Sequence, residues 1–83
     1  MKDFSKEICI TNNFCPEFIF NGLHTIAASR YYISVLDDER HSYFFNMEEK
    51  GGSWKIIDAP KVPDWIMAIE KKLEDAIFEN MMN

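Results

Sequence analysis

The chain has 83 residues, a formal net charge of −5 at pH 7 and 47% hydrophobic residues. This length predicts a single domain over residues 1–83, and the hydrophobic content excludes an intrinsically disordered chain. The nine Lys and Arg residues are scattered along the sequence. We therefore expect no nucleic-acid partner and no anionic membrane surface, because both are bound through clustered basic residues.

The N-terminal residues are charged and lead into no long apolar run, so the sequence shows no secretory signal. No stretch approaches the roughly 18–20 apolar residues of a membrane span. These absences predict a soluble cytoplasmic protein. In that compartment Cys9 and Cys15 are expected to be free thiols, because two cysteines are too few to indicate a disulfide scaffold.

The first half of the chain shows short β-prone runs. Within the uncertain segment 1–16, polar and apolar residues alternate over 6–11, which indicates a short edge strand. Two further runs, 17–20 and 23–26, flank Asn21-Gly22, a dipeptide that favours a type I′ hairpin turn. Residues 27–30 have weak β propensity and fit a bulge, a bend or a short helical turn equally well.

Three more strands are predicted at 31–36, 41–47 and 54–57, joined by polar connections. Sequential strands with such short connections favour an antiparallel meander over 17–57.

The end of the chain has helical periodicity over 63–80. Pro63 suits the first helical position, and Asp64 places a negative charge near the positive end of the helix dipole. Apolar residues recur on one side, with Trp65 as the expected anchor. This stripe consists of Val62, Trp65, Ile66, Ile69, Leu73, Ala76 and Ile77. The predicted fold class is α+β: an antiparallel β-meander of three to five strands with one C-terminal helix packed on one face.

Candidate chemistry is sparse. The soft metal ligands are His24, His41 and the two cysteines, and their spacing matches no common zinc pattern. The acidic run 37–39 is better explained as a solvated turn than as a calcium loop. Gly51-Gly52-Ser53 lacks the following helix and lysine of a phosphate loop and is read as a hairpin turn. We expect no metal, no cofactor and no enzymatic activity.

Strand alternation divides the sheet into two faces. One is continuously apolar and suits the helix; it carries Tyr31, Ile33, Val35, Tyr43, Phe45, Met47, Trp54 and Ile56. The other is mixed, yet it carries more apolar side chains than a solvated face normally shows, namely Tyr32, Leu36, Phe44 and Ile57. On the helix, Met67, Phe78 and Met81 fall outside the apolar stripe, either because the helix end frays or because they form a groove for a partner.

Three explanations of the mixed face remain open. Residues 1–16 fold across it with Phe4, Ile8 and Ile10, or it pairs with a second copy or another protein, or it lines a small-molecule site. We expect a non-catalytic domain that acts through protein contacts and forms a homodimer. A ligand-binding or regulatory module is the alternative. The predicted interaction residues are Tyr32, Leu36, Phe44, Ile57, Met67, Phe78 and Met81.

Overall fold

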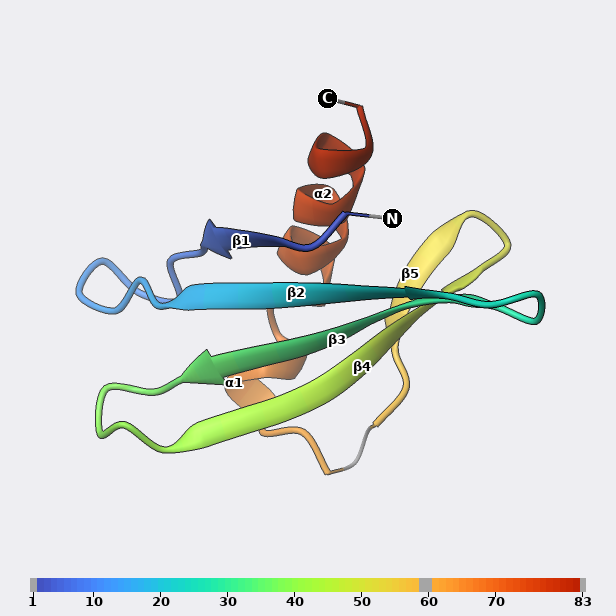
Figure 1. Ribbon diagram of the computed structural model, residues 1–83. Coiled ribbons are helices and arrows are strands. Elements are labelled where there is room, and N and C mark those ends of the chain that lie inside the picture. The colour runs from blue at the N-terminus through green and yellow to red at the C-terminus, as the bar shows by residue number, and fades with distance from the viewer. Residues whose placement is uncertain (1, 59–60, 83) are drawn as a thin grey trace.

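The computed structural model describes residues 2–58 and 61–82, which form one curled antiparallel sheet with two helical segments behind it (Figure 1). Strand order follows the sequence, which confirms an α+β fold with a β-meander. Ala59 and Pro60, at the predicted transition from strands to helix, lie outside the described residues. The elements are β1 (Phe4–Glu7), β2 (Glu17–His24), β3 (Ser29–Leu36), β4 (Ser42–Lys50), β5 (Ser53–Ile56), α1 (Asp64–Met67) and α2 (Glu70–Met81).

The hairpin predicted at Asn21-Gly22 is wrong. Both residues lie inside β2, where Asn21 is opposite Tyr32 and Gly22 is opposite Tyr31. The chain reverses five residues later, between His24 and Ser29, and there the Thr25 N–H donates to the Ala28 carbonyl oxygen at 2.9 Å. Long pairing with β3, which aligns the apolar side chains of both strands, outweighs the local turn preference of Asn-Gly.

The N-terminal segment does not cover the mixed face. Its strand begins earlier than predicted, and β1 pairs with β2 at the edge of the sheet, from Phe4 opposite Phe20 to Glu7 opposite Glu17. Phe4 stacks on Phe20 on the helix side, with ring centroids 4.3 Å apart, and Ile8 is buried in the same core. One of the three explanations of the mixed face is thereby excluded.

The predicted apolar face is the inner face of the sheet, and it packs against the helical segments. All its members are buried except Tyr43, which is partly buried against the same core. The predicted helical stripe is likewise buried, apart from Trp65, which lies half-buried against the rings of Phe14 and Tyr43. Trp65 therefore closes the border of the core, whereas Leu73 lies at its centre with no exposed surface.

The single helix predicted over 63–80 is interrupted. Ile69 has φ −108° and ψ 17°, outside the helical region, so that α1 ends before it and α2 begins after it. The two segments run in different directions behind the sheet (Figure 1). Ile66 of α1 and Ile69 at the break are both buried in the core.

Helix α2 also protects the free edge of β5. The carboxylates of Glu70 and Glu74 accept the N–H groups of Ile56 and Trp54, at 2.9 Å and 2.8 Å. Four residues of helix and two residues of strand span nearly the same length, about 6 Å and 6.7 Å, so the two repeats match. Exposed edge strands invite pairing with other chains, and on this edge the N–H groups of Trp54 and Ile56 are already occupied.

Candidate functional site

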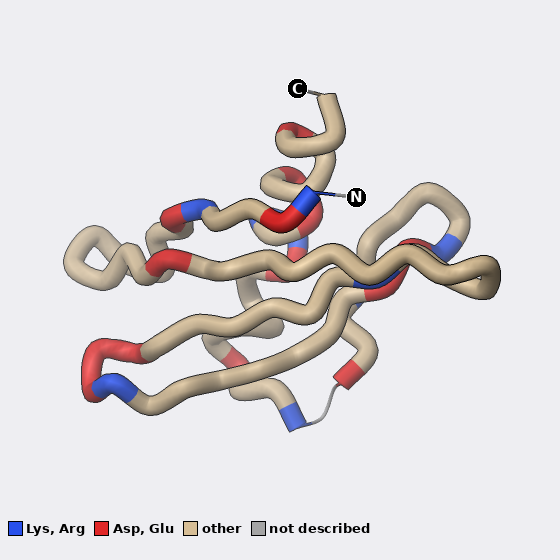
Figure 2. Tube along the Cα trace, in the orientation of Figure 1, with Lys and Arg blue, Asp and Glu red and all other residues tan. Residues whose placement is uncertain are grey.

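The outer face of the sheet is uncovered. We define it by the side chains that alternate with the core positions, and its large apolar members are exposed: Tyr32 by 43%, Leu36 by 50% and Phe44 by 58%. Charged residues of the three long strands lie at the strand ends, so the middle of this face carries none (Figure 2). The outer face is therefore an apolar and neutral-polar surface with charges at its borders.

An aromatic pair forms the centre of the outer face. Tyr32 of β3 and Phe44 of β4 stack with ring centroids 5.8 Å apart and an interplanar angle of 12°. Phe44 lies opposite Ser34, which in turn lies opposite Ile19 of β2. At the border, Arg30 and Glu48 are opposite each other and form a 2.7 Å ion pair. This border pair leaves no uncompensated charge at that position.

The predicted interaction residues separate into two groups. Tyr32, Leu36 and Phe44 lie together on the outer face, with Ile57 half-buried beyond the end of β5. Met67 and Phe78 do not face away from the core as the helical wheel predicted, because both are partly buried against it. Met81 is exposed at the end of α2. A role of these residues in binding stays a prediction.

Two members of the outer face were missed. Ile19 and Leu23 are exposed there on β2, in register with Ser34 and Arg30. Ile19 alternates with the buried Phe18 and Phe20, a pattern that is readable in the sequence. Leu23 was missed because the expected turn at Asn21-Gly22 separated it from that strand.

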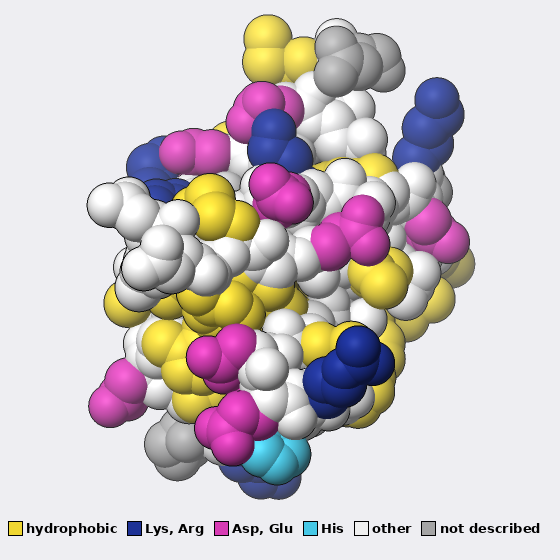
Figure 3. All heavy atoms as spheres, turned by 90° about the vertical axis from the view of Figure 1, so that its left-hand side faces the viewer, with side chains coloured by type: hydrophobic (Ala, Val, Ile, Leu, Met, Phe, Trp, Pro, Cys, Tyr) yellow, Lys and Arg dark blue, Asp and Glu magenta, His cyan; other side chains and the backbone are white. Residues whose placement is uncertain are grey.

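A hollow of about 450 Å³ lies at one end of the outer face. It opens where β2 and β3 separate: their pairing reaches only as far as Ile19 and Ser34, and beyond that point β2 stays with β1 and β3 with β4. The strands diverge visibly toward the left of Figure 1. Viewed from that side, hydrophobic side chains reach the surface with acidic side chains among them (Figure 3).

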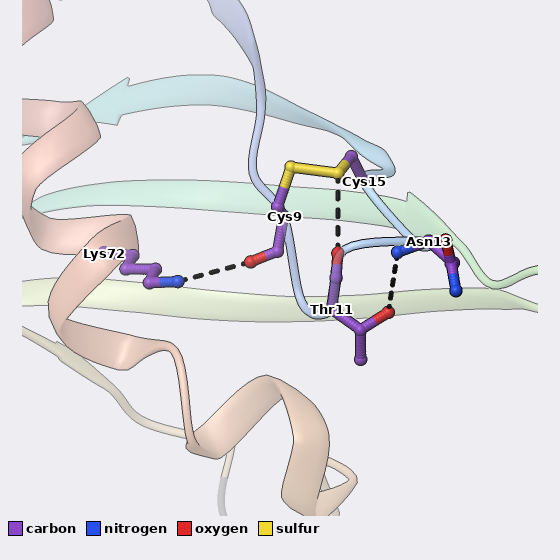
Figure 4. The surroundings of a disulfide bond; sticks show 5 residues. All are labelled: Cys9, Thr11, Asn13, Cys15 and Lys72. Atoms are coloured by element: carbon purple, nitrogen blue, oxygen red, sulfur yellow. Dashed lines mark hydrogen bonds between the residues drawn. A yellow bond between two sulfur atoms is a disulfide. The ribbon is translucent and has the colours of Figure 1, made fainter.

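One wall of the hollow is the β1–β2 loop, and the structure corrects the expectation of free thiols here. Cys9 and Cys15 form a disulfide across this loop (Figure 4). The Cys15 Sγ atom lies 3.6 Å from the Thr11 carbonyl oxygen, a contact and not a hydrogen bond, because a disulfide sulfur carries no proton. The number of cysteines did not predict this disulfide, because Cys9 and Cys15 become neighbours only when the loop folds back.

Further contacts hold this loop against the helices. The Ile10 N–H donates to the Phe14 carbonyl oxygen at 2.8 Å, which closes the loop. Lys72 of α2 donates to the Cys9 carbonyl oxygen at 3.3 Å, and the Phe14 ring meets Trp65 of α1 at a centroid distance of 5.6 Å. These contacts within the chain therefore hold this wall of the hollow in place without a ligand.

The second wall is the β3–β4 turn, which Asp37 organises. Its carboxylate accepts the N–H groups of Glu39 at 2.9 Å and His41 at 2.8 Å, and the Tyr43 hydroxyl at 3.2 Å. Partial burial raises the pKa of Asp37, but the hydrogen bonds from His41 and Glu39 outweigh it and hold the pKa below its ordinary value. Desolvation and the neighbouring Asp37 carboxylate raise the pKa of Tyr43. The acidic run 37–39 therefore forms the predicted turn.

The nearest approach to a catalytic arrangement is His24 with Ser29, whose Nδ1 and Oγ atoms are 2.9 Å apart. A nucleophilic serine needs a histidine that a third group orients. Within residues 2–58 and 61–82, no carboxylate is hydrogen-bonded to the His24 ring, and the contact is exposed. It is best explained as the closing contact of the β2–β3 hairpin.

The same described ranges contain no group of three His, Cys, Asp or Glu residues arranged to hold a metal ion. Neither helix in the described part of the chain is long and apolar enough to cross a membrane. Comparisons with protein-family models, with curated proteins and with solved structures returned no match for this chain. The outer face and its hollow are therefore the candidate functional surfaces of this protein.

Proposed function

We propose that this protein is a non-catalytic interaction domain that forms a weak homodimer through the outer face of its sheet. The observation that carries the proposal is the group of exposed apolar side chains around the Tyr32–Phe44 stack, on the side that the helices leave uncovered. Soluble monomers rarely expose contiguous apolar patches beyond a few hundred Å². Such a patch is stabilised when another apolar surface replaces water over it.

A second copy fits this face in size and shape. Three strands of eight or nine residues and two strands of four residues, spaced about 4.8 Å apart, give roughly 500 Å² per copy, or about 1,000 Å² in total. That total is at the lower limit for a specific stable interface, so we expect micromolar affinity. Two sheets pack face to face about 10 Å apart, and a two-fold axis brings the same patch from both copies together.

Electrostatics permit this pairing. The middle of the face is uncharged, and Arg30 already pairs with Glu48 within the chain. Burial of this pair therefore leaves no lone charge, which would be the costly case. The net charge of −5 on each copy opposes association mildly, so the dimer should strengthen as salt screens the repulsion.

Sedimentation velocity over a concentration series tests the proposal. The variant Phe44→Glu places a charge in the centre of the face and should weaken the dimer by at least about tenfold. The variant Ala27→Glu adds the same charge to the exposed β2–β3 turn and should leave the dimer intact. Both variants should keep the circular dichroism of the wild type, because neither position is buried.

A wild type that sediments as a monomer at about 100 micromolar, which corresponds to about 5.5 kcal/mol of association energy, would refute the dimer. Equal weakening by Phe44→Glu and Ala27→Glu would show that net charge, and not the aromatic centre, governs association.

A further inference from the structure

The hollow between β2 and β3 has the properties of a small-molecule site. Its volume of about 450 Å³ lies within the usual range of about 300–1,000 Å³ for ligand pockets. Phe14, Val35 and Phe44 contribute apolar surface from three different segments of the chain. The disulfide-closed loop and the turn around Asp37 fix its two walls.

The charges that line the hollow are acidic. Glu17 and Asp37 contribute carboxylates, whereas no Lys or Arg side chain lines it in the described part of the chain. The β3–β4 turn also carries Arg40 and His41, but neither residue lines the hollow. The His41 ring pairs with Asp37 at 3.2 Å. A ligand with a positive charge therefore complements this site, and an anionic ligand does not.

Glu17 is the carboxylate that remains available. The Asp37 oxygens already accept several donors of their own turn, whereas Glu17 accepts only the Ser5 hydroxyl, at 3.2 Å, within the described residues. Glu17 also lies directly opposite Glu7 across β1 and β2. Like charges in such a cross-strand pair repel each other. A cation beside Glu17 would relieve that repulsion.

We propose that the hollow binds a small organic cation, an ammonium group attached to an apolar, aromatic or branched body. The ammonium group contacts Glu17, and the body lies on Ile19 and Phe44. This inference goes beyond the proposed dimer and does not require it. Because Ile19, Leu36 and Phe44 belong both to the hollow and to the outer face, the ligand and the second copy compete for the same surface.

Chemical-shift titration of backbone amides with 2-phenylethylammonium tests the site. The matched anion, 3-phenylpropanoate, has the same ring and a similar chain with the opposite charge. We expect saturable shifts at residues 13–19, 34–37 and 42–44, and about tenfold tighter binding of the cation than of the anion. The variant Glu17→Gln should remove most of that preference. Glu49→Gln, which makes the same charge change on the part of β4 that pairs with β5, should keep it.

The titration is carried out on wild type and on Leu23→Glu, whose position lies on the outer face but does not line the hollow. If the dimer proposal is correct, Leu23→Glu is monomeric and no second copy competes with the ligand. The cation should then bind this variant at least as tightly as it binds the wild type. If the wild type is itself a monomer, cation binding in the hollow still supports the site while the dimer is refuted. Equal affinity for cation and anion, shifts elsewhere, or no shift at about 10 mM ligand would overturn the site whatever the oligomeric state.

Discussion

The two faces of this sheet have similar aromatic residues but opposite environments. Tyr31 and Phe45 on the inner face are buried, whereas their neighbours Tyr32 and Phe44 on the outer face are about half exposed. Alternation along a strand produces both faces at once, and the single helical layer can cover only one of them. Composition therefore does not decide which aromatic residues form the core; the position of the helices does.

The largest expected effect comes from replacing a leucine by alanine, and the comparison is sharpest when this substitution is made once on each face. Leu73→Ala opens a cavity where the helix meets the inner face and should cost about 2–5 kcal/mol. Leu36→Ala removes the same atoms from the exposed outer face and should cost less than about 1 kcal/mol in the monomer. Chemical denaturation at low protein concentration measures both. Similar losses would contradict the assignment of a single core.

The disulfide should contribute next. Its loop spans a sequence separation of 6 and, in the chain-entropy model, closing a loop of that length stabilises the fold by roughly 2 kcal/mol. We expect Cys9→Ser with Cys15→Ser to lower the unfolding free energy by about that amount and to remain folded, because the inner-face core is unchanged. Loss of the folded state in the double variant would show that the loop, and not the core, determines the stability of the fold.

Removal of a hydrogen bond that closes the edge of the sheet should have a smaller effect. Glu74→Ala leaves the Trp54 N–H without its acceptor and should cost about 1–2 kcal/mol. Glu79→Ala on the same helix removes only an exposed 3.6 Å pair with Lys6 and should cost almost nothing. Equal effects in thermal melts would show that the β5 edge does not need the carboxylate.

Acid should have the smallest effect, through the hydrogen bond that Glu74 accepts. The hydrogen bond from the Trp54 N–H lowers the pKa of Glu74 below its ordinary value of 4.5, against the opposing effect of desolvation. A lowered folded-state pKa gives stability that is complete above the unfolded value and is lost as the pH falls through the folded value. Stability should thus decline below about pH 4.5, and less steeply in Glu74→Gln. Parallel pH profiles of the two proteins would exclude this role of Glu74.

Much of the inner side follows from the sequence alone. The spacing of Tyr31, Ile33 and Val35 defines one face of β3, and the periodicity from Val62 to Ile77 defines the buried side of the helical region. Both signals are periodic patterns of apolar residues that burial of one face requires. They can therefore be read without knowing which segments pack against that face. The position of β4 and β5 and the antiparallel order followed from the short connections in the same way.

Other features were decided by tertiary structure. Asn21-Gly22 is a strong local turn signal, but pairing along the whole of β2 places these residues inside a strand. The break at Ile69 divides the helical region into two segments, and in that arrangement Met67 and Phe78 pack against the core. Each case depends on contacts between residues distant in sequence, which local propensity does not contain.

The candidate site shows the same division between local and long-range information. The sequence alone determined that Tyr32, Leu36 and Phe44 share one face, because a strand has a period of two. Only the folded chain decided that residues 1–16 pair at the edge of the sheet instead of covering that face, and that Cys9 meets Cys15. It also decided that β2 and β3 separate beyond Ile19 and open the hollow. These outcomes depend on where whole segments pack, and packing is determined by the complete set of buried contacts rather than by any one stretch of residues.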